Sequence, residues 1–225
     1  MVKHVSWTDI ESFYHVRKHV AAYPHITNGL SEVIYQAKVK LHGSCAAIAI
    51  ESDGTVTAMS RQAVLSTTSD NAGFAKWVDA RKETFAKFAH APGFTYVLFG
   101  EWCGPGVQKG VAVNQMKERS LVLFAARVLN EEGITVEFHS HPPTLARIAS
   151  QVPGCYALPW YNGGEQFIVD WSSEAEVLQP IVDRINTHVL QVEQCDPWML
   201  QQFDVKGIGE GLVFYPGTLW HAGYE

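Results

Sequence analysis

The stretch that decides the fold covers residues 33–50 and reads Val33-Ile34-Tyr35-Gln36-Ala37-Lys38-Val39-Lys40-Leu41-His42-Gly43-Ser44-Cys45-Ala46-Ala47-Ile48-Ala49-Ile50. Its β-branched, aromatic and small apolar residues predict two strands, 33–37 and 45–50, joined by a tight turn. Lys40 would end the first strand, and Gly43 would let the backbone approach a ligand closely. A lysine becomes a good nucleophile when neighbouring cations or burial lower its pKa, so this turn is a candidate site of covalent chemistry.

Further runs of strand-forming residues follow at 56–59, 94–99, 121–128, 134–138 and 211–214. Asp53-Gly54 precedes the first of these runs and is typical of a two-residue hairpin turn. We therefore expect the strands 33–37, 45–50 and 56–59 to form a meander with Lys40 in its first loop. The strand 94–99 leads into a segment with three glycines, residues 100–106, which favours an irregular loop near a ligand.

Helices are expected around these strands. Thr8-x-x-Glu11 resembles a capping box and predicts a helix over residues 9–21. Apolar residues recur at helical spacing over 71–90, which predicts one long helix that packs its aromatic side chains on the sheet. Further helices are expected at 143–151, at 173–192 and after Asp196-Pro197. In the last of these, Asp196 suits the N-cap and Pro197 the first helical position. No repeat or clear linker is present, so the simplest architecture is one α+β domain.

Composition limits the function classes. The 225 residues, 47% of them hydrophobic, can bury the core of one domain or of a domain with a small satellite. No run of about 18 apolar residues occurs, so we expect no membrane span and a cytoplasmic location. The four cysteines form no C-x-x-C pair, which predicts free thiols. The net charge of -6 argues against binding nucleic acid through bulk charge, so any such contact would be local, as at Lys38 and Lys40.

Five sequence elements occur in a fixed order. They are Lys40-Leu41-His42-Gly43, Ser60-Arg61, the phrase from Phe99 to Lys109, the strand Leu121-Val122-Leu123-Phe124-Ala125, and Glu210-Gly211-Leu212-Val213. Together they resemble the motifs of the covalent nucleotidyltransferases, which include the ATP-dependent ligases and the capping enzymes. The resemblance is closest to the RNA ligase 2 family. That family has lysine-x-His-Gly where DNA ligases usually have lysine-x-Asp-Gly, and it has a phrase similar to Phe-Gly-Glu-x-x-Gly-Pro-Gly-x-Gln-Lys.

The resemblance implies a fold and a reaction. The fold is a nucleotidyltransferase (ATP-grasp-like ligase) domain over residues 1–225, with antiparallel sheets flanked by helices around an ATP pocket. Lys40 would attack the α-phosphorus of ATP and form lysyl-AMP. The enzyme would then pass AMP to the 5′-phosphate of an RNA end, and attack by a 3′-hydroxyl would seal the strand. A nicked RNA duplex is the expected substrate and a monomer the expected state, with no membrane partner.

The same resemblance implies roles for particular side chains. Arg61 and Glu101 would hold the ribose, and Phe124 would stack on the adenine. His42 and Gly43 would belong to the same nucleotide site. Glu210, with Glu101, would engage Mg²⁺ or Mn²⁺, and Glu210 would share the catalytic role with Lys40. These residue types suit the chemistry, because a hydrated divalent metal beside carboxylates can position a phosphate and relieve its charge.

Some positions depart from the family. A lysine pair is expected 15 to 20 residues after Glu210, and the tail from Tyr215 to Glu225 contains no lysine. Tyr215 stands where lysine is common, and Ser44-Cys45 replaces a more usual Thr-Asn. We therefore expect a fragment without the lysine-pair strand and any C-terminal domain, with slow self-adenylylation. A DNA ligase or capping-type enzyme, against which His42 argues, and a nucleotide-binding relic without catalysis stay as alternatives.

A competing motif begins at His139-Ser140-His141-Pro142 and continues, seven residues later, with Ser150. It resembles the zinc signature of JAMM-type isopeptidases, in which two histidines and an aspartate bind the metal. Proline, Pro153, occupies the expected aspartate position. With only two protein ligands such a zinc site would be incomplete, so a polar turn is the preferred interpretation.

Overall fold

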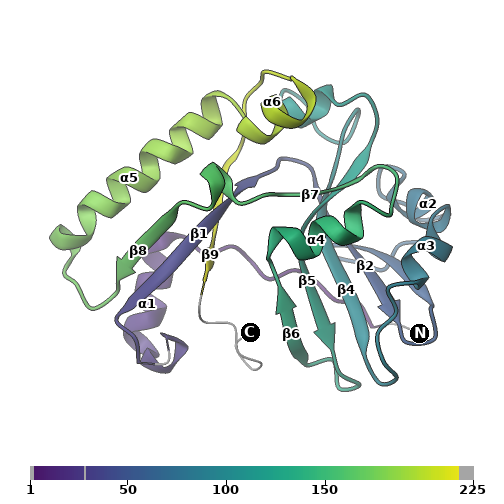
Figure 1. Ribbon diagram of the computed structural model, residues 1–225, viewed down its shortest axis with the longest axis horizontal. Coiled ribbons are helices and arrows are strands. Elements are labelled where there is room, and N and C mark those ends of the chain that lie inside the picture. Colours follow the sequence, from purple (N-terminus) through teal and green to yellow (C-terminus); the bar gives the residue numbers. More distant parts are fainter. Residues whose placement is uncertain (1–2, 28, 218–225) are drawn as a thin grey trace. The chain divides into compact units, whose positions relative to one another are not determined.

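The computed structural model describes residues 3–27 and 29–217, and its mixture of helices and antiparallel strands confirms the α+β prediction (Figure 1). These residues form two compact units. The first contains residues 3–7 and 41–158, and the second contains residues 8–40 and 159–217. Within the described residues the chain passes from one unit to the other after Trp7, after Lys40 and after Leu158.

The first unit is built on a six-stranded sheet. Its main strands are β2 (Ser44–Glu51), β3 (Val56–Ser60), β4 (Thr95–Cys103), β5 (Ser120–Leu129) and β6 (Thr135–His139). They pair antiparallel in the order β3-β2-β4-β5-β6, and the short β7 (Cys155–Ala157) pairs parallel with β5. The predicted Asp53-Gly54 turn is confirmed, since Gly54 has φ +85° and the Thr55 N–H donates to Asp53 Oδ1 at 2.8 Å.

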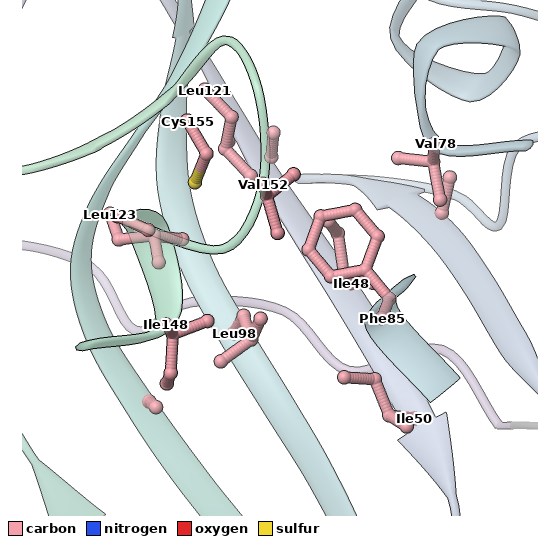
Figure 2. Packing of buried hydrophobic residues seen from close by; sticks show 14 of the residues in the cluster. Ile48, Ile50, Val78, Phe85, Leu98, Leu121, Leu123, Ile148, Val152 and Cys155 are labelled. Atoms are coloured by element: carbon pink, nitrogen blue, oxygen red, sulfur yellow. The ribbon is translucent and has the colours of Figure 1, made fainter. Parts of the chain in front are cut away.

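One face of this sheet carries the main hydrophobic core. Alternate residues of the strands, such as Ile48, Leu98 and Leu123, point to the same side and are fully buried. Three helices cover them: α2 (Phe74–Asp79), α3 (Lys82–Ala86) and α4 (Pro142–Ala149). Figure 2 shows this packing, with Phe85 and Ile148 lying against the strand residues.

The single long helix predicted over 71–90 is wrong, because the chain forms α2 and α3 as two short helices. Arg81 leaves helical geometry between them, with φ -125° and ψ 7°. Its guanidinium donates to the Trp77 and Pro153 carbonyls at 3.1 and 2.8 Å, so it satisfies the end of α2. The prediction that the aromatic residues are core is confirmed, since Phe74 and Phe85 are buried.

The second unit has a three-stranded antiparallel sheet in the order β8-β1-β9, formed by β1 (Glu32–Lys40), β8 (Gln166–Asp170) and β9 (Gly211–Pro216). The predicted meander is therefore wrong, since β1 does not pair with β2. β1 instead pairs with β8 along one edge and with β9 along the other, and its residues Val33, Ala37 and Val39 are buried. The strands β7 and β8 had not been predicted. Both are short, and β8 alternates between buried and exposed residues over only five positions.

Helices cover one face of the small sheet. The long helix α5 (Ala175–Gln194) lies along it, and α1 (Phe13–Ala22) joins the same core through Phe13, Val16 and Val20 (Figure 1). The predicted capping box at Thr8 is wrong. The helix begins later, at the N-cap Ser12, whose hydroxyl accepts from the His15 N–H. The predicted start after Asp196 is confirmed, because its carboxylate accepts from two N–H groups at the start of α6 (Pro197–Phe203).

Short 3-10 helices complete the structure: η1 (Pro24–Thr27), η2 (Ala112–Gln115) and η3 (Tyr161–Gly163). All four cysteines are free, as predicted. Among the described residues, no helix has the length and apolar character needed to cross a membrane.

Candidate active site

Lys40 and Glu210 meet at the adjoining ends of two strands. Lys40 is the last residue of β1 and pairs in register with Gly211, the first residue of β9, so Glu210 stands directly beside it. The Lys40 ammonium donates a hydrogen bond to Glu210 Oε1 and forms an ion pair with it. Both side chains are about one-third exposed, at 36% and 29%. The structure therefore brings together the two predicted catalytic residues, 170 positions apart in sequence.

A second lysine lies on the same face of β1. Lys38 is two residues before Lys40, and residues two apart on a strand point to the same side of the sheet. Its side chain is fully buried. The Nζ atom lies 4.9 Å from the ring centroid of Trp160 and 5.4 Å from that of Tyr215. Burial lowers the pKa of Lys38 from 10.5 to about 7.

Gly43 packs tightly against β4. A Cβ atom on this residue would lie 2.5 Å from the Trp102 carbonyl oxygen and 2.8 Å from Glu101 Cγ, so only glycine fits without a shift. The close approach that the sequence predicted for Gly43 is thus an approach to the protein's own strand. It lets the Gly43 N–H donate to Glu101 Oε1 at 3.1 Å, while Gln108 donates to the Gly43 carbonyl at 3.0 Å.

The phrase from Phe99 to Lys109 therefore combines a strand with a loop. β4 continues through Cys103, so the irregular loop begins four residues later than predicted and Glu101 lies on a strand. Arg119 holds the following loop by donating to the Pro105 and Ala72 carbonyls at 2.8 and 2.9 Å. Glu101 on the strand thus accepts from the Gly43 N–H, and Gln108 in the loop donates to the Gly43 carbonyl.

Arg61, Glu101 and Phe124 belong to one face of the large sheet. Cys45 pairs in register with Glu101, and its thiol is influenced by both charged groups. Burial raises the pKa of this thiol to about 11, the Glu101 carboxylate adds to the effect, and Arg61 partly offsets it. Arg61 follows the end of β3, next to Ser60, which pairs with Ala46.

Phe124 reaches this face through a β-bulge. Phe99 pairs with Ala125 and Gly100 pairs with Leu123, so Phe124 is the extra residue that no β4 residue opposes. A bulge re-aims the side chain of its extra residue. The Phe124 ring packs beside the buried residues Phe99 and Ala125 of the face that lies opposite the main core.

The predicted site residues thus fall into two groups. Gly43, Arg61, Glu101 and Phe124 gather in the first unit, and Lys40 and Glu210 pair in the second unit. His42 lies in the loop between β1 and β2 with a half-buried side chain.

Sequence reasoning assigned no individual role to Lys38, Gln108 or Arg119. The spacing of two between Lys38 and Lys40 was the available signal for a shared strand face. Nothing in the sequence indicated that Trp160 and Tyr215 would cover Lys38, because these rings come from distant segments.

The site has few protein ligands for a metal. Within residues 3–27 and 29–217, no cluster of three or more His, Cys, Asp or Glu side chains is placed to hold an ion. His139 instead pairs with Glu137 at 3.1 Å, and His141 is the N-cap residue of α4. The zinc isopeptidase interpretation therefore finds no support among these residues.

Comparison with known proteins agrees with this geometry. A family model described as RNA ligase matches residues 33–220. None of the curated proteins matches the chain. Three solved structures of a Naegleria gruberi RNA ligase are similar in fold. One is the ligase with PPi (TM-score 0.57, 17% identity, covering 96% of this chain and 54% of that one). A second is a variant of that ligase with ATP and Mn (TM-score 0.56, 17% identity, covering 94% of this chain and 53% of that one). A third is another variant with AMP and Mn (TM-score 0.58, 16% identity, covering 96% of this chain and 54% of that one).

The chain thus spans about half the length of the solved ligases that it resembles. At these identities the solved structures show the shared fold, and the family match over 33–220 covers most of the chain. The chain belongs to the RNA ligase family.

Proposed function

We propose that this chain is the adenylyltransferase part of an ATP-dependent RNA ligase and that Lys40 is its nucleophile. The contact between Lys40 and Glu210 at the adjoining ends of β1 and β9, in a chain of the RNA ligase family, carries the proposal. The Naegleria gruberi RNA ligase, which is similar in fold, has been solved with ATP, with AMP and with PPi, which are the substrate and products expected of nucleotidyl transfer.

The reaction consists of three nucleophilic displacements at phosphorus. The Lys40 amine, after losing a proton to solvent, forms a bond to the α-phosphorus of ATP, and pyrophosphate leaves. An oxygen of an RNA 5′-phosphate then attacks the same phosphorus, and the bond to Lys40 breaks. Finally an RNA 3′-hydroxyl attacks the 5′-phosphate, and AMP leaves. Each step needs in-line positioning and compensation of phosphate charge more than further covalent chemistry.

The residues of the first unit are suited to the nucleoside. The Gly43 N–H donates to the Glu101 carboxylate and fixes its position. A carboxylate oxygen of Glu101 can also accept a hydrogen bond from a ribose hydroxyl. Phe124 offers a π-face for the adenine, and aromatic stacking on a base is worth about 1–3 kcal/mol. Arg61 is exposed near Glu101 and can contact a phosphate.

The carboxylates fit a magnesium or manganese ion. Mg²⁺ usually keeps several water ligands and binds through one or two carboxylates and the substrate phosphates, so it needs no larger protein cluster. Glu210 is the carboxylate of the second unit predicted to hold this ion, and Glu101 is the carboxylate of the first unit to which the sequence resemblance gave the same role. When bound, the ion supplies positive charge beside the phosphate. Glu210 engaged in this way would no longer stabilise the protonated amine of Lys40.

Several finer points rest on the sequence resemblance. They are the nicked RNA duplex as substrate and the monomeric state, while the cytoplasmic location stays an expectation from the composition of the sequence. The prediction that a lysine pair is missing concerns a tail of which residues 218–225 lie outside the described part of the chain. Slow adenylylation therefore stays a prediction, as does the alternative of a nucleotide-binding relic.

Incubation with ATP and Mg²⁺ tests the proposal. The protein should gain the mass of one AMP, and peptide mapping should place the AMP on Lys40. Lys40→Ala should abolish the adduct. Lys82→Ala is the matched control, because Lys82 is exposed and contacts only Asp79 among the contacts described for it, so this variant should be labelled normally.

Three results would count against the proposal. If peptide mapping placed the AMP on Lys38, then Lys38 and not Lys40 would be the nucleophile. Binding of ATP without any adduct would favour the relic. An adduct formed equally well from GTP would favour a capping-type enzyme. Transfer of AMP from the labelled protein to a 5′-phosphate on nicked RNA, in preference to nicked DNA, would support the RNA substrate.

A further inference from the structure

A segment outside the family match crosses the face of the large sheet that carries the candidate nucleotide residues. Residues 3–7 belong to the first unit, although they precede it in the sequence by more than thirty positions. Val5 and Trp7 are half-buried, while Ser6 between them is exposed. This alternation is typical of an extended segment that turns one of its two sides toward the protein surface and the other toward solvent.

The segment is fixed at the edge strand next to Arg61. The Val5 N–H donates to Met59 Sδ at 3.4 Å, and His4 Nε2 lies 2.9 Å from the Ser60 carbonyl oxygen. Both partners belong to the end of β3. The first anchor of the segment is therefore the strand end that presents Arg61.

Trp7 is the second anchor, at the other side of the same face. Its ring centroid lies 4.9 Å from that of Phe99 on β4 and 6.1 Å from that of Phe138 on β6. The guanidinium carbon of the buried Arg127 lies 5.0 Å from the Trp7 ring, which is cation–π geometry. These contacts with three strands fix the plane of the indole.

The indole also contacts Phe124. The two ring centroids are 5.0 Å apart, and the planes meet at 69°, which is an edge-to-face arrangement. Phe124 is the extra residue of a bulge, so it has no register partner on β4. Trp7 therefore supplies a lateral contact that the strand pairing does not.

We propose that Trp7 is a positioning residue of the nucleotide site, which holds the Phe124 ring in the orientation that stacks on the base. The inference rests on the proposed function, because it takes Phe124 as the stacking residue. It adds the N-terminal segment, which lies outside residues 33–220, to the parts that the site requires.

Equilibrium binding of ATP to the purified protein tests this inference. Trp7→Ala should raise the Kd for ATP about three- to ten-fold, since an edge-to-face aromatic contact contributes about 0.5–1.5 kcal/mol. Trp7→Phe should recover most of the affinity, because it keeps an aromatic edge. At saturating ATP, Trp7→Ala should still label Lys40, since the change concerns the binding of the base and leaves the Lys40–Glu210 pair intact.

Trp77→Ala is the matched control. Trp77 lies in the same unit, packs with the main core on the other side of the sheet and has Arg81 4.4 Å from its ring. The Trp77→Ala variant should lower the melting temperature at least as much as Trp7→Ala does, and it should leave the Kd for ATP unchanged.

The outcomes separate the inference from the proposed function. Unchanged ATP affinity in Trp7→Ala, or equal weakening in Trp77→Ala, would overturn the positioning role while Lys40 labelling persists. Tighter binding in Trp7→Ala would also overturn it, since the indole would then cover the base site. If the unmodified protein binds ATP and forms no adduct, the proposed ligase chemistry fails, and the Kd comparison still decides the role of Trp7. A protein that binds no ATP overturns both.

Discussion

Replacing Lys38 with methionine should make the protein more stable near neutral pH, and the gain should disappear in alkaline solution. The Lys38 side chain is fully buried, and burial lowers its pKa from 10.5 to about 7. Methionine keeps a long flexible side chain of similar reach without the charge. The variant therefore removes the cost of burying an ammonium group while it keeps most of the packing.

The magnitude follows from the two pKa values. A drop from 10.5 to about 7 corresponds to about 5 kcal/mol of unfavourable burial when the amine is protonated. The contacts with the Trp160 and Tyr215 rings oppose it, because a desolvated cation–π contact contributes about 1–2 kcal/mol. We expect a net gain of about 2 kcal/mol for Lys38→Met below pH 7.

The pH dependence has a definite sign. Between the folded pKa near 7 and the unfolded value of 10.5, the unfolded chain binds more protons at this position than the folded chain. The stability of the unmodified protein therefore rises with pH through this window relative to the variant. Above about pH 10.5 both states carry a neutral amine, and the burial penalty is gone.

Urea unfolding at several values between about pH 6.5 and pH 10 measures the difference. Lys82→Met is the control, because Lys82 is 61% exposed and its substitution should give no trend in this window. A difference between Lys38→Met and the unmodified protein that stays constant with pH would refute the reasoning. A Lys38→Met variant that is less stable than the unmodified protein, by the same amount at pH 6.5 and at pH 10, would also refute it.

Other predictions concern the turn, a helix cap and the metal. Gly43→Ala should lower stability by about 2 kcal/mol or more in thermal unfolding, because its Cβ would lie 2.5 Å from the Trp102 carbonyl oxygen; an unchanged melting temperature would contradict this packing. Asp196→Ala should cost about 1–2 kcal/mol in urea unfolding, since its carboxylate accepts from the Trp198 and Met199 N–H groups at 3.0 Å; Asp196→Asn should recover most of the loss. A chelator should stop AMP labelling and leave the melting temperature unchanged, because the described residues contain no metal cluster that could stabilise the fold; a large drop in melting temperature would reveal a structural ion.

Local sequence patterns identified most elements and several of their ends. Runs of strand-forming apolar residues located β2, β3, β5 and β6 to within a residue or two, and Asp53-Gly54 and Asp196-Pro197 marked a turn and a helix start correctly. These signals work because they depend on neighbours a few positions away. The prediction of one helix over 71–90 failed, because the apolar periodicity continues through Arg81. There the chain leaves helical geometry, and the guanidinium donates to the nearby Trp77 carbonyl and to the distant Pro153 carbonyl.

The sequence by itself determined the α+β class, the RNA ligase resemblance and the position of Lys40 at a strand end. Only the tertiary structure decided that β1 joins β8 and β9 instead of β2, which places Glu210 beside Lys40. It also decided that Trp160 and Tyr215 cover Lys38, and that Trp7 contacts Phe124 at a bulge. The physical reason is that a strand's own residues fix its two faces, whereas its partners depend on which distant segments bury those faces best.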